Sequence, residues 1–464
     1  MNKVSNLIQR VQKLVEPSNE QRYLVENVYT NVKEVLSKEL KRVFPDFDIT
    51  LQGSVAKDTF LPDEIDLDVF VLFPETISKE WFEKVFVNIV INTFKNYSPE
   101  ILYAEHPYVR INMKGIEVDI VPAYRLRPGE KPRTAVDRTP LHTKYVIDHL
   151  AENQRKEVRL LKLFMKTLGI YGAEIKVKGF SGYLCELLVI AYGSFLEVLR
   201  AATKWRPFKI CIDIEKHYTT YKDCLETFRN SPLVVVDPVD PLRNAASAVS
   251  LKSLARFMAA AFSFLEKPSE NYFTSEQVEN YVPEIVKNLG IASIIINIPQ
   301  LSPDVLWGEL QRVAKRFADE LKYLGFEVID VGIWSDEKKV AIIIAETIPQ
   351  ELPSIELHIG PPAWNFNHVK KFIEKNRGVI ISGPWIRDDG KVVILRPRKI
   401  RKLKEAIERR LNLILIAPHI NLESIKEICT DIECLEKYTR DYRDLMPWLK
   451  KHLKKRDKAL LSMY

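Results

Sequence analysis

Two aspartates on one expected strand are the residues of this sequence best suited to chemistry. Asp66 and Asp68 lie in the run 65–73, whose β-branched and aromatic residues predict a strand. Residues i and i+2 of a strand point to the same face, so the two carboxylates project side by side. Such a pair resists burial unless a cation lies between its members, and Mg²⁺ favours carboxylates together with substrate phosphates. A solvated strand end is the alternative interpretation.

A third carboxylate and a Gly-Ser turn extend this pattern. Gly53 and Ser54 follow an expected strand over residues 47–51. Asp119 lies on the second of two expected strands, 108–113 and 116–121, which the tight turn Lys114-Gly115 joins. Taken alone, Asp119 fits the polar face of an edge strand equally well. Together with the first pair, it completes a set of three acidic ligands.

This set of residues predicts nucleotidyl transfer. A 3′-hydroxyl that attacks an α-phosphate needs a lowered pKa, and the leaving pyrophosphate needs its charge neutralised. Two Mg²⁺ ions held by three carboxylates supply both effects. We expect Asp66 and Asp68 to bind both ions, and Asp119 to complete the site of the ion that binds the attacking hydroxyl. Ser54 and the backbone amides after Gly53 would hold the β- and γ-phosphates at a helix start.

Helical patterns surround these strands. Ser18 and Gln21 form a capping-box signature at the start of a helix that runs to about residue 43. A second apolar helix is expected over residues 78–97. Residues 143–195 are expected to be helical, Ser181 is expected to cap an apolar helix that runs through residue 198, and a further helix is expected over 247–265.

The chain of 464 residues is long enough for two to four domains. We expect divisions at 1–142, 143–267 and 268–464. The five cysteines suggest neither a disulfide framework nor a metal site, which favours a reducing, cytoplasmic compartment. No apolar run is long enough to span a membrane. The glycine motifs of P-loop and Rossmann proteins are absent from the sequence.

The C-terminal part has a different character. Strands are expected over 293–298, 326–333 and 340–346, with a helix over 303–324, and this β-α-β-β order suggests a ferredoxin-like α+β module. Further strands are expected over 379–382 and 392–396. Basic residues with interleaved aromatics predict a nucleic-acid surface, and ordinary surface lysines are the alternative. The residues expected to bind RNA are Lys370, Lys371, Arg396, Arg398, Lys399, Arg401 and Lys402.

The order of Gly53-Ser54, Asp66-x-Asp68 and Asp119 resembles the polymerase-β-like nucleotidyltransferases. Within that superfamily, the chain is most similar to the archaeal (class I) CCA-adding tRNA nucleotidyltransferases. The stretches that carry this likeness are GSVAKDTFLP, YAEHPYVRI, EVDIVPAY, RTPLHTKY, RLLKLFMKTLGIYGAEIKVKGFSGYLCELL and DPVDPLRNAA. They cover residues 1–264 closely and leave the remainder only loosely matched.

The resemblance implies an α+β protein with a nucleotidyltransferase head, a helical central domain and a C-terminal RNA-binding region. It implies that His142, Lys162 and Tyr171 contact the incoming nucleotide, and it places Arg243 near the base of that nucleotide. The alternative interpretations are a surface loop histidine for His142 and a solvated helix face for Lys162. For Tyr171 the alternative is a core aromatic, and for Arg243 it is a loop salt bridge. Many members carry Arg three residues after the motif serine, where this chain has Lys57, so a point charge replaces a bidentate fork in triphosphate binding.

The resemblance further implies CCA addition to tRNA 3′ ends from CTP and ATP with two Mg²⁺ ions. Members of that family form homodimers, although no residue pattern here marks an interface. Two other functions stay open at this stage. One is a relative with the same chemistry and another product, such as a poly(A) polymerase or an oligoadenylate synthetase. The other is a tRNA-binding protein without activity, which the intact set of three aspartates disfavours.

Overall fold

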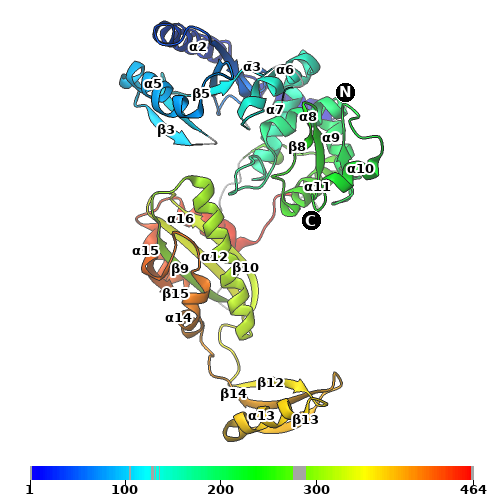
Figure 1. Cartoon of the computed structure of the whole chain (residues 1–464). Helices are drawn as coiled ribbons and strands as arrows, with labels where there is room; N and C mark the ends of the chain where they lie inside the picture. The colour runs from blue at the N-terminus through cyan, green and yellow to red at the C-terminus, as the bar shows by residue number, and fades with distance from the viewer. Residues whose placement is uncertain are drawn as a thin grey trace. The chain divides into compact units, whose positions relative to one another are not determined.

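The computed structural model describes residues 3–103, 106–126, 130, 132–134, 136–274 and 289–460. The chain folds as two compact units (Figure 1). The first unit consists of residues 1–277 together with 456–464, and the second consists of residues 278–455.

A five-stranded sheet forms the N-terminal head of the first unit, with strand order β1-β2-β5-β4-β3. The strands β2 and β5 are parallel, and every other neighbouring pair in this sheet is antiparallel. The strands are β1 (Asp48–Gln52), β2 (Asp66–Phe73), β3 (Glu100–Tyr103), β4 (Pro107–Met113) and β5 (Ile116–Tyr124). The strands expected around residues 47–51, 65–73, 108–113 and 116–121 are therefore confirmed.

The head helices cover one face of this sheet. The helix α2 (Asn19–Leu40) begins at Ser18, whose side chain accepts from the Gln21 backbone N–H while the Gln21 side chain caps in return, as expected. Apolar residues of α2 and of the segment 79–97 form one core with alternate residues of β2, namely Leu67, Val69, Val71 and Phe73. Because side chains alternate along a strand, Asp68 shares its parity with Phe70 on the opposite face.

The single helix expected over residues 78–97 is wrong in detail. The structure instead has α4 (Lys79–Trp81), a π-helical turn η1 (Phe82–Phe86), α5 (Val87–Thr93) and a 3₁₀ turn η2 (Lys95–Tyr97). Phe82 and Phe86, at the two ends of the π turn, both pack on the buried Phe73, with ring centroids 5.6 and 5.7 Å away. The apolar pattern therefore identified the buried face but not the change of helix type.

The central part of the first unit is mainly helical. Its elements are η3 (Val136–Arg138), α6 (Thr139–His149), α7 (Glu152–Thr167), α8 (Gly182–Tyr192), α9 (Phe195–Ala202), β6 (Cys211–Ile212), α10 (Tyr221–Thr227), β7 (Val234–Asp237), β8 (Asp240–Asn244), α11 (Leu251–Glu266) and η4 (Glu270–Phe273). The cap at Ser181, which accepts from the Leu184 N–H at 3.1 Å, is confirmed. The continuous helices expected over 143–195 and up to 198 are wrong, because residues 168–181 form a loop and Gly193, at φ +91°, ends α8.

Both ends of the chain join the core of these central helices. The apolar face of α1 (Lys3–Val15), with Val11 and Val15, packs against α7. At the other end, Ala459 lies in the same core, and its carbonyl accepts a hydrogen bond from the Ser263 hydroxyl at 3.0 Å. The chain therefore returns to its first unit after completing the second.

The second unit contains a four-stranded sheet with order β10-β11-β9-β15. Apolar runs such as 294–296 and 341–345 are buried because helices cover both faces (Figure 1). The strands are β9 (Gly290–Asn297), β10 (Glu327–Ser335), β11 (Val340–Ile348) and β15 (Ile425–Cys429). The helices of this part are α12 (Pro303–Leu324), α14 (Leu403–Ile414), the 3₁₀ turn η7 (Leu422–Ser424), α15 (Ile432–Thr439) and α16 (Leu445–Lys454). The three strands and the helix expected over 293–346 are confirmed.

A smaller sheet of order β12-β14-β13 is inserted between β11 and α14. Its elements are β12 (Ile355–Pro362), α13 (Phe366–Asn376), the 3₁₀ turn η6 (Arg377–Val379), β13 (Ser382–Ile386) and β14 (Lys391–Pro397). The strand expected over 392–396 is confirmed. The strand expected over 379–382 begins only at Ser382, because η6 occupies the residues before it.

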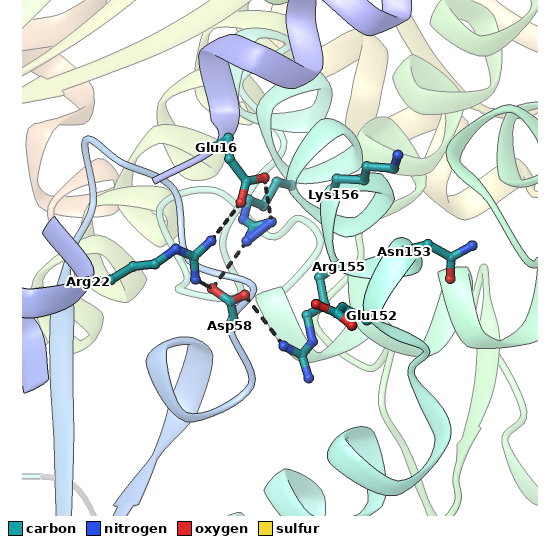
Figure 2. A pocket seen from close by; sticks show the side chains of 8 residues that line it. Glu16, Arg22, Asp58, Glu152, Asn153, Arg155 and Lys156 are labelled. Carbon is teal, nitrogen blue, oxygen red and sulfur yellow. Dashed lines mark hydrogen bonds and ion pairs between the residues drawn. The ribbon is translucent and has the colours of Figure 1, made fainter. Parts of the chain in front are cut away.

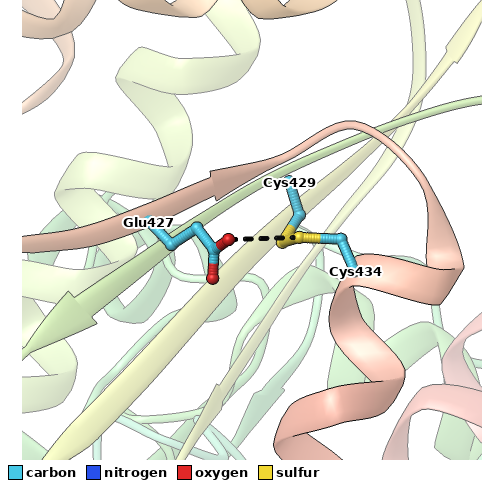
Figure 3. Close-up of side chains that lie close together, drawn as sticks. All are labelled: Glu427, Cys429 and Cys434. Carbon is cyan, nitrogen blue, oxygen red and sulfur yellow. Dashed lines mark hydrogen bonds between the residues drawn. A yellow bond between two sulfur atoms is a disulfide. The ribbon is translucent and has the colours of Figure 1, made fainter.

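The expectation that no cysteines pair is wrong. The structure joins Cys211 to Cys224, with 6.5 Å between their Cα atoms, and Cys429 to Cys434, with 5.6 Å. Both separations fall within the usual range for a disulfide. The second pair lies where β15 ends and α15 begins, with the Glu427 carboxylate beside it (Figure 3). Cys185 is the remaining cysteine, and it is buried.

Within the part of the chain that the structure describes, no single helix is both long and apolar enough to cross a membrane. The bent pair α8 and α9 passes that test of length and composition when the two are taken together.

Candidate active site

The three aspartates lie together on two neighbouring strands. In the parallel pairing of β2 with β5, Asp68 is in register with Asp119, and Asp66 is in register with Glu117. Gly53 approaches Asp68 so closely that a Cβ atom there would lie 1.8 Å from Oδ2 of Asp68. Gly53 also has φ +69°, a conformation that L side chains rarely adopt. Glycine is therefore required for the turn to reach the carboxylate.

The carboxylates repel one another. Burial, followed by the negative charge of Asp119, raises the pKa of Asp68 to about 6. Burial and then Glu117 raise the pKa of Asp66. Acidic groups that are held together against this cost are typical of sites that take a cation. The donor set, which consists entirely of carboxylate oxygens, fits Mg²⁺.

Arg110 is a site residue that our sequence reasoning missed. Its guanidinium donates to Oδ1 of Asp119 at 2.7 Å and to Oδ2 at 2.8 Å, and it also lies 3.1 Å from Glu117. The sequence could have indicated this pairing, because counting residues back from the two-residue turn at Lys114-Gly115 places residue 110 opposite residue 119. Arg110 thus pairs directly with Asp119, whereas Lys57 is the positive charge with the larger effect on Asp68.

Lys57 and Lys162 meet around one buried carboxylate, Glu186 of α8. The Nζ atom of Lys57 lies 2.6 Å from Oε2 of Glu186, and the Nζ atom of Lys162 lies 3.6 Å from Oε1. Thr59 links the two sides, because its hydroxyl donates to Glu186 at 2.5 Å and its carbonyl accepts from Lys162 at 2.9 Å. All three charged side chains are at most 7% exposed, so the solvated-face interpretation of Lys162 is wrong.

The protonation of this cluster follows from its burial. Burial alone would raise the pKa of Glu186, but Lys57 and Lys162 outweigh it and hold that pKa below its ordinary value. Burial lowers the pKa of Lys162, and the charge of Glu186 opposes this effect. Glu186 was not among the sequence candidates, since a lone glutamate in an apolar helix pattern carries no spacing signal.

Tyr171 lies beside this cluster. It forms a bridge with Phe180 across the loop that precedes α8, and burial raises its pKa. A Cβ atom on Gly182 would lie 3.2 Å from the Tyr171 hydroxyl and 3.4 Å from Nζ of Lys162. The structure thus brings Tyr171, Lys162 and Lys57 together, as the resemblance implies for a nucleotide site.

His142 and Arg243 meet at a second buried carboxylate, Asp237. Nε2 of His142 lies 2.8 Å from Oδ2 of Asp237, and NH1 of Arg243 donates to the same oxygen at 2.6 Å. The Tyr183 hydroxyl donates to Oδ1 at 3.0 Å, and its ring stacks on His142 at 4.2 Å. Burial would raise the pKa of Asp237, but His142 and Arg243 overcome that effect and lower it to about 2.

Two sequence interpretations need correction here. His142 lies on α6 and is mostly buried, so it is not a surface loop histidine. Arg243 lies on the short strand β8, which we expected to be a loop. Asp237 and Tyr183 were missed, because nothing in the sequence indicates that residues 142, 183, 237 and 243 come together.

A charged pocket of about 650 Å³ lies behind the loop that carries Lys57 (Figure 2). Its centre is Asp58, which pairs with Arg22, with Arg155 at 3.5 Å and with Arg159 at 3.2 Å. Glu16 also pairs with Arg22 and Arg159, at 2.6 and 3.2 Å. Arg159 is 2% exposed, so these pairs hold the active-site loop against α7.

The basic residues of the second unit fall into two groups. Arg396 pairs with Glu356 at 2.8 Å, Arg398 pairs with Glu356 at 3.3 Å, and Arg401 pairs with Glu351 at 3.0 Å. Of the lysines expected to bind RNA, all four are exposed and have no ion-pair partner among the residues that the structure describes. They are Lys370, Lys371, Lys399 and Lys402.

Comparison with known proteins gives one consistent result. Residues 33–142 match the nucleotidyltransferase domain, 156–274 match the tRNA nucleotidyltransferase second domain, and 289–425 match the CCA-adding enzyme C-terminal domain. The CCA-adding enzyme of Pyrobaculum neutrophilum is 39% identical over 89% of this chain and 94% of its own length. The enzyme of Saccharolobus shibatae is 39% identical over 93% and 98%. That of Saccharolobus solfataricus is 40% identical over 84% and 88%.

Proposed function

Because this chain belongs to the archaeal-type CCA-adding enzymes, we propose that Asp66, Asp68 and Asp119 carry its nucleotidyl transfer. The chain is an α+β tRNA nucleotidyltransferase that adds CCA to the 3′ ends of tRNA. The observation that carries the proposal is the pairing of Asp68 with Asp119, beside the Gly53 turn that no other residue could form.

The aspartates would hold two Mg²⁺ ions. When bound, these ions would lower the pKa of the attacking 3′-hydroxyl and neutralise charge on the leaving pyrophosphate. The raised pKa values of Asp66 and Asp68 support this assignment, because their crowded negative charges are relieved by a cation. Asp119 would help to remove the proton of the hydroxyl, and Arg110 would hold Asp119 in position through two hydrogen bonds.

The triphosphate would bind along one side of the aspartates. Ser54 and the backbone amides that begin α3 (Gly53–Ala56) would hold the β- and γ-phosphates. Lys57, Lys162 and Tyr171 would supply charge and a hydroxyl donor. Their convergence around Gly182 and Glu186 supports this role.

The cluster at Asp237 would read the base. On their Watson–Crick edges, CTP and ATP share an exocyclic amine beside a ring nitrogen acceptor. UTP and GTP lack this arrangement on the same edge. Polar groups that pair with this edge are left unpaired by the wrong base, and such discrimination is large. Arg243 and His142, both held by Asp237, are the residues we assign to this edge. Arg243 would also meet the terminal phosphates of the tRNA.

The body of the tRNA would lie on the second unit. Double-stranded RNA offers shape, phosphates and 2′-hydroxyls rather than readable base edges in its deep groove. The unpaired lysines at 370, 371, 399 and 402 suit such contacts, and the arginines at 396, 398 and 401 would contribute their remaining donors. We also propose that the part of the second unit with the four-stranded sheet is ferredoxin-like. Its β-α-β-β-α-β order and its strand order β10-β11-β9-β15 support this proposal.

A homodimer is part of the same proposal. Alternate residues Ile355, Leu357 and Ile359 of β12 lie on the sheet face away from α13, and they are 43%, 43% and 49% exposed. Trp385 of β13 adds to this apolar face, which a second copy could cover. Leu357→Glu should convert the dimer to monomer in light scattering, whereas Lys404→Glu, which changes an exposed residue of α14, should not.

The test of activity uses tRNA that lacks its 3′ terminal residues. The protein, Mg²⁺ and each single labelled nucleotide are incubated with this tRNA, and the products are sized. Addition of two residues from CTP and of one further residue when ATP follows is the expected result. Unlimited addition from ATP alone would instead support a poly(A) polymerase.

A further inference from the structure

The carboxylate of Glu186 lies between two lysines and has no water-exposed surface. Each oxygen has a defined neighbour, since Oε2 faces Lys57 at 2.6 Å and Oε1 accepts from Thr59 at 2.5 Å with Lys162 at 3.6 Å. The cluster therefore holds two positive charges and one negative charge inside the protein. A buried carboxylate in this position is costly unless it is paired with an ammonium group, and two buried ammonium groups are costly unless a carboxylate lies between them.

The two ammonium groups are not interchangeable in this arrangement. Lys162 donates to the Thr59 carbonyl at 2.9 Å and to the Thr59 hydroxyl at 3.1 Å, and it faces Tyr171 across Gly182. Lys57 has Glu186 as its partner and stands 5.9 Å from the centre of the Tyr183 ring. An ammonium group has three donors, so Lys57 retains donors for a ligand.

Removal of the negative charge would destabilise one of these ammonium groups. Buried like charges disfavour the protonated form of a lysine, and burial acts in the same direction. The groups that face Lys162 are Glu186 and Cys185 of α8, Lys57 and Thr59 of the active-site loop, and Tyr171. Glu186 is the one carboxylate among these neighbours of Lys162, whereas Lys57 faces Tyr183 and also interacts with the charge of Asp68.

We propose that Glu186 is a positioning residue of the nucleotide site, which keeps Lys57 and Lys162 charged and aimed at the incoming triphosphate. This inference rests on the proposed role of the two lysines in nucleotide binding. It goes beyond that role because it assigns their charge state to a residue that does not itself contact the nucleotide. The competing explanation is that Glu186 only fastens the active-site loop to α8.

Glu186→Gln separates the two explanations, because the amide keeps the shape and an acceptor oxygen but loses the charge. Because the charge of each lysine then disfavours protonation of the other without a carboxylate between them, kcat/KM for CTP should fall by about twofold at pH 6.5 and by about tenfold or more at pH 9. The affinity for CTP, measured by equilibrium dialysis, should follow the same pH trend. The KM for tRNA should change much less.

The control is Glu215→Gln, which removes a carboxylate that accepts from Tyr145 at 2.6 Å in the same central part. It should leave the pH profile for CTP unchanged. A loss in Glu186→Gln that is the same at every pH, together with a lower unfolding temperature, would overturn the inference in favour of simple fastening.

Two further variants test separately whether Lys57 and Lys162 bind the nucleotide, which the inference about Glu186 assumes. Lys57→Ala and Lys162→Met should each raise the Kd for CTP, and Lys162→Met with Glu186→Gln should bind CTP no worse than Lys162→Met alone. If neither lysine variant weakens CTP binding, the proposed role of the lysines is wrong. If both do but Glu186→Gln adds its full loss to Lys162→Met, only the role of Glu186 is wrong.

Discussion

Glu186 and Lys162 of the first unit are buried, and both have fixed partners, since Lys57 and Thr59 contact the same carboxylate and Thr59 also accepts from Lys162. The lysines at 370, 371, 399 and 402 of the second unit are exposed, and none has an ion-pair partner among the described residues. Buried charges act strongly on a reacting group because little water screens them, but they are costly to hold. Exposed charges act weakly and adapt to any phosphate backbone. The proposed reaction site therefore uses buried, paired charges, whereas the proposed RNA surface uses exposed, unpaired ones.

The arginines of the second unit lie between these two cases. Arg396 and Arg398 share Glu356, so part of their charge already stabilises the fold. Their neutralisation would combine lost tRNA contacts with lost structure. Replacement of the exposed lysines is therefore the cleaner test of the RNA surface.

The largest expected effect belongs to the three aspartates that we propose to be catalytic. Replacement of Asp66, Asp68 or Asp119 by Ala should lower the rate of nucleotide addition by about a hundredfold or more, since a lost metal interaction is worth several kcal/mol. Binding of tRNA, measured by filter retention, should be nearly unchanged. Near-normal incorporation by Asp66→Ala and Asp119→Ala would contradict the assignment of these carboxylates to nucleotidyl transfer.

The cost of burying that charge should appear as stability. The pKa of Asp68 in the folded protein, about 6, lies above its ordinary value of 3.8, so the folded state binds this proton more tightly. Stability from this group is therefore complete below about pH 4 and is lost as the pH rises through 6. At pH 7.5 without metal, Asp68→Asn should raise the free energy of unfolding by about 3 kcal/mol.

The pH and the metal both serve as controls for this gain. The gain should vanish at pH 3.5, where Asp68 is protonated in both states, and saturating Mg²⁺ should favour the native carboxylate instead. Asp148→Asn, which changes an exposed partner of Lys144, should show no such dependence. An Asp68→Asn protein that is less stable than the native chain at pH 7.5 would mean that Arg110 and Lys57 already compensate the charge.

An intermediate effect is expected at Arg243, which is one-third exposed and held by Asp237. Arg243→Ala should lower kcat/KM for CTP and ATP by about tenfold and reduce their discrimination against UTP by a similar factor. Arg200→Ala, in an exposed pair with Glu197, is the matched control. Unchanged rate and selectivity would leave Arg243 as a simple salt bridge.

The smallest effect per residue is expected at the exposed lysines. Replacement of Lys370, Lys371, Lys399 and Lys402 together by Ala should raise the KM for tRNA several-fold and flatten its dependence on salt, because fewer counterions are released. The rate at saturating tRNA should change little. A salt dependence identical to that of the native protein would identify these lysines as solvated surface, and a fall in kcat alone would connect them to the active site.

Local patterns predicted most of the elements around the site. Alternation in β2 and β5 placed Asp66, Asp68 and Asp119 on strands, and Ser18 and Ser181 marked helix starts correctly. The same rules failed between residues 168 and 181 and within 79–97. In the first stretch glycine conformation overrode the helical periodicity, and in the second the apolar pattern identified the buried face but not the change of helix type.

The carboxylates that organise the nucleotide site could not be predicted in this way. Glu186 is 129 residues from Lys57, and Asp237 is 95 residues from His142. No spacing rule reaches so far, because such contacts depend on how helices and strands pack. The disulfide partners Cys211 and Cys224 meet for the same reason, since β6 and α10 bring them together.

The sequence by itself predicted the chemistry, since Asp66, Asp68 and Asp119 on strands after a Gly-Ser turn indicate a site for a cation and a phosphate substrate. The sequence also contained the position of Arg110 opposite Asp119, which counting residues across the Lys114-Gly115 turn would have predicted. Only the tertiary structure decided which charges are buried and paired. Burial sets the local dielectric and so the pKa of every group, and it arises when distant segments such as α7, α8 and the Lys57 loop close around one carboxylate.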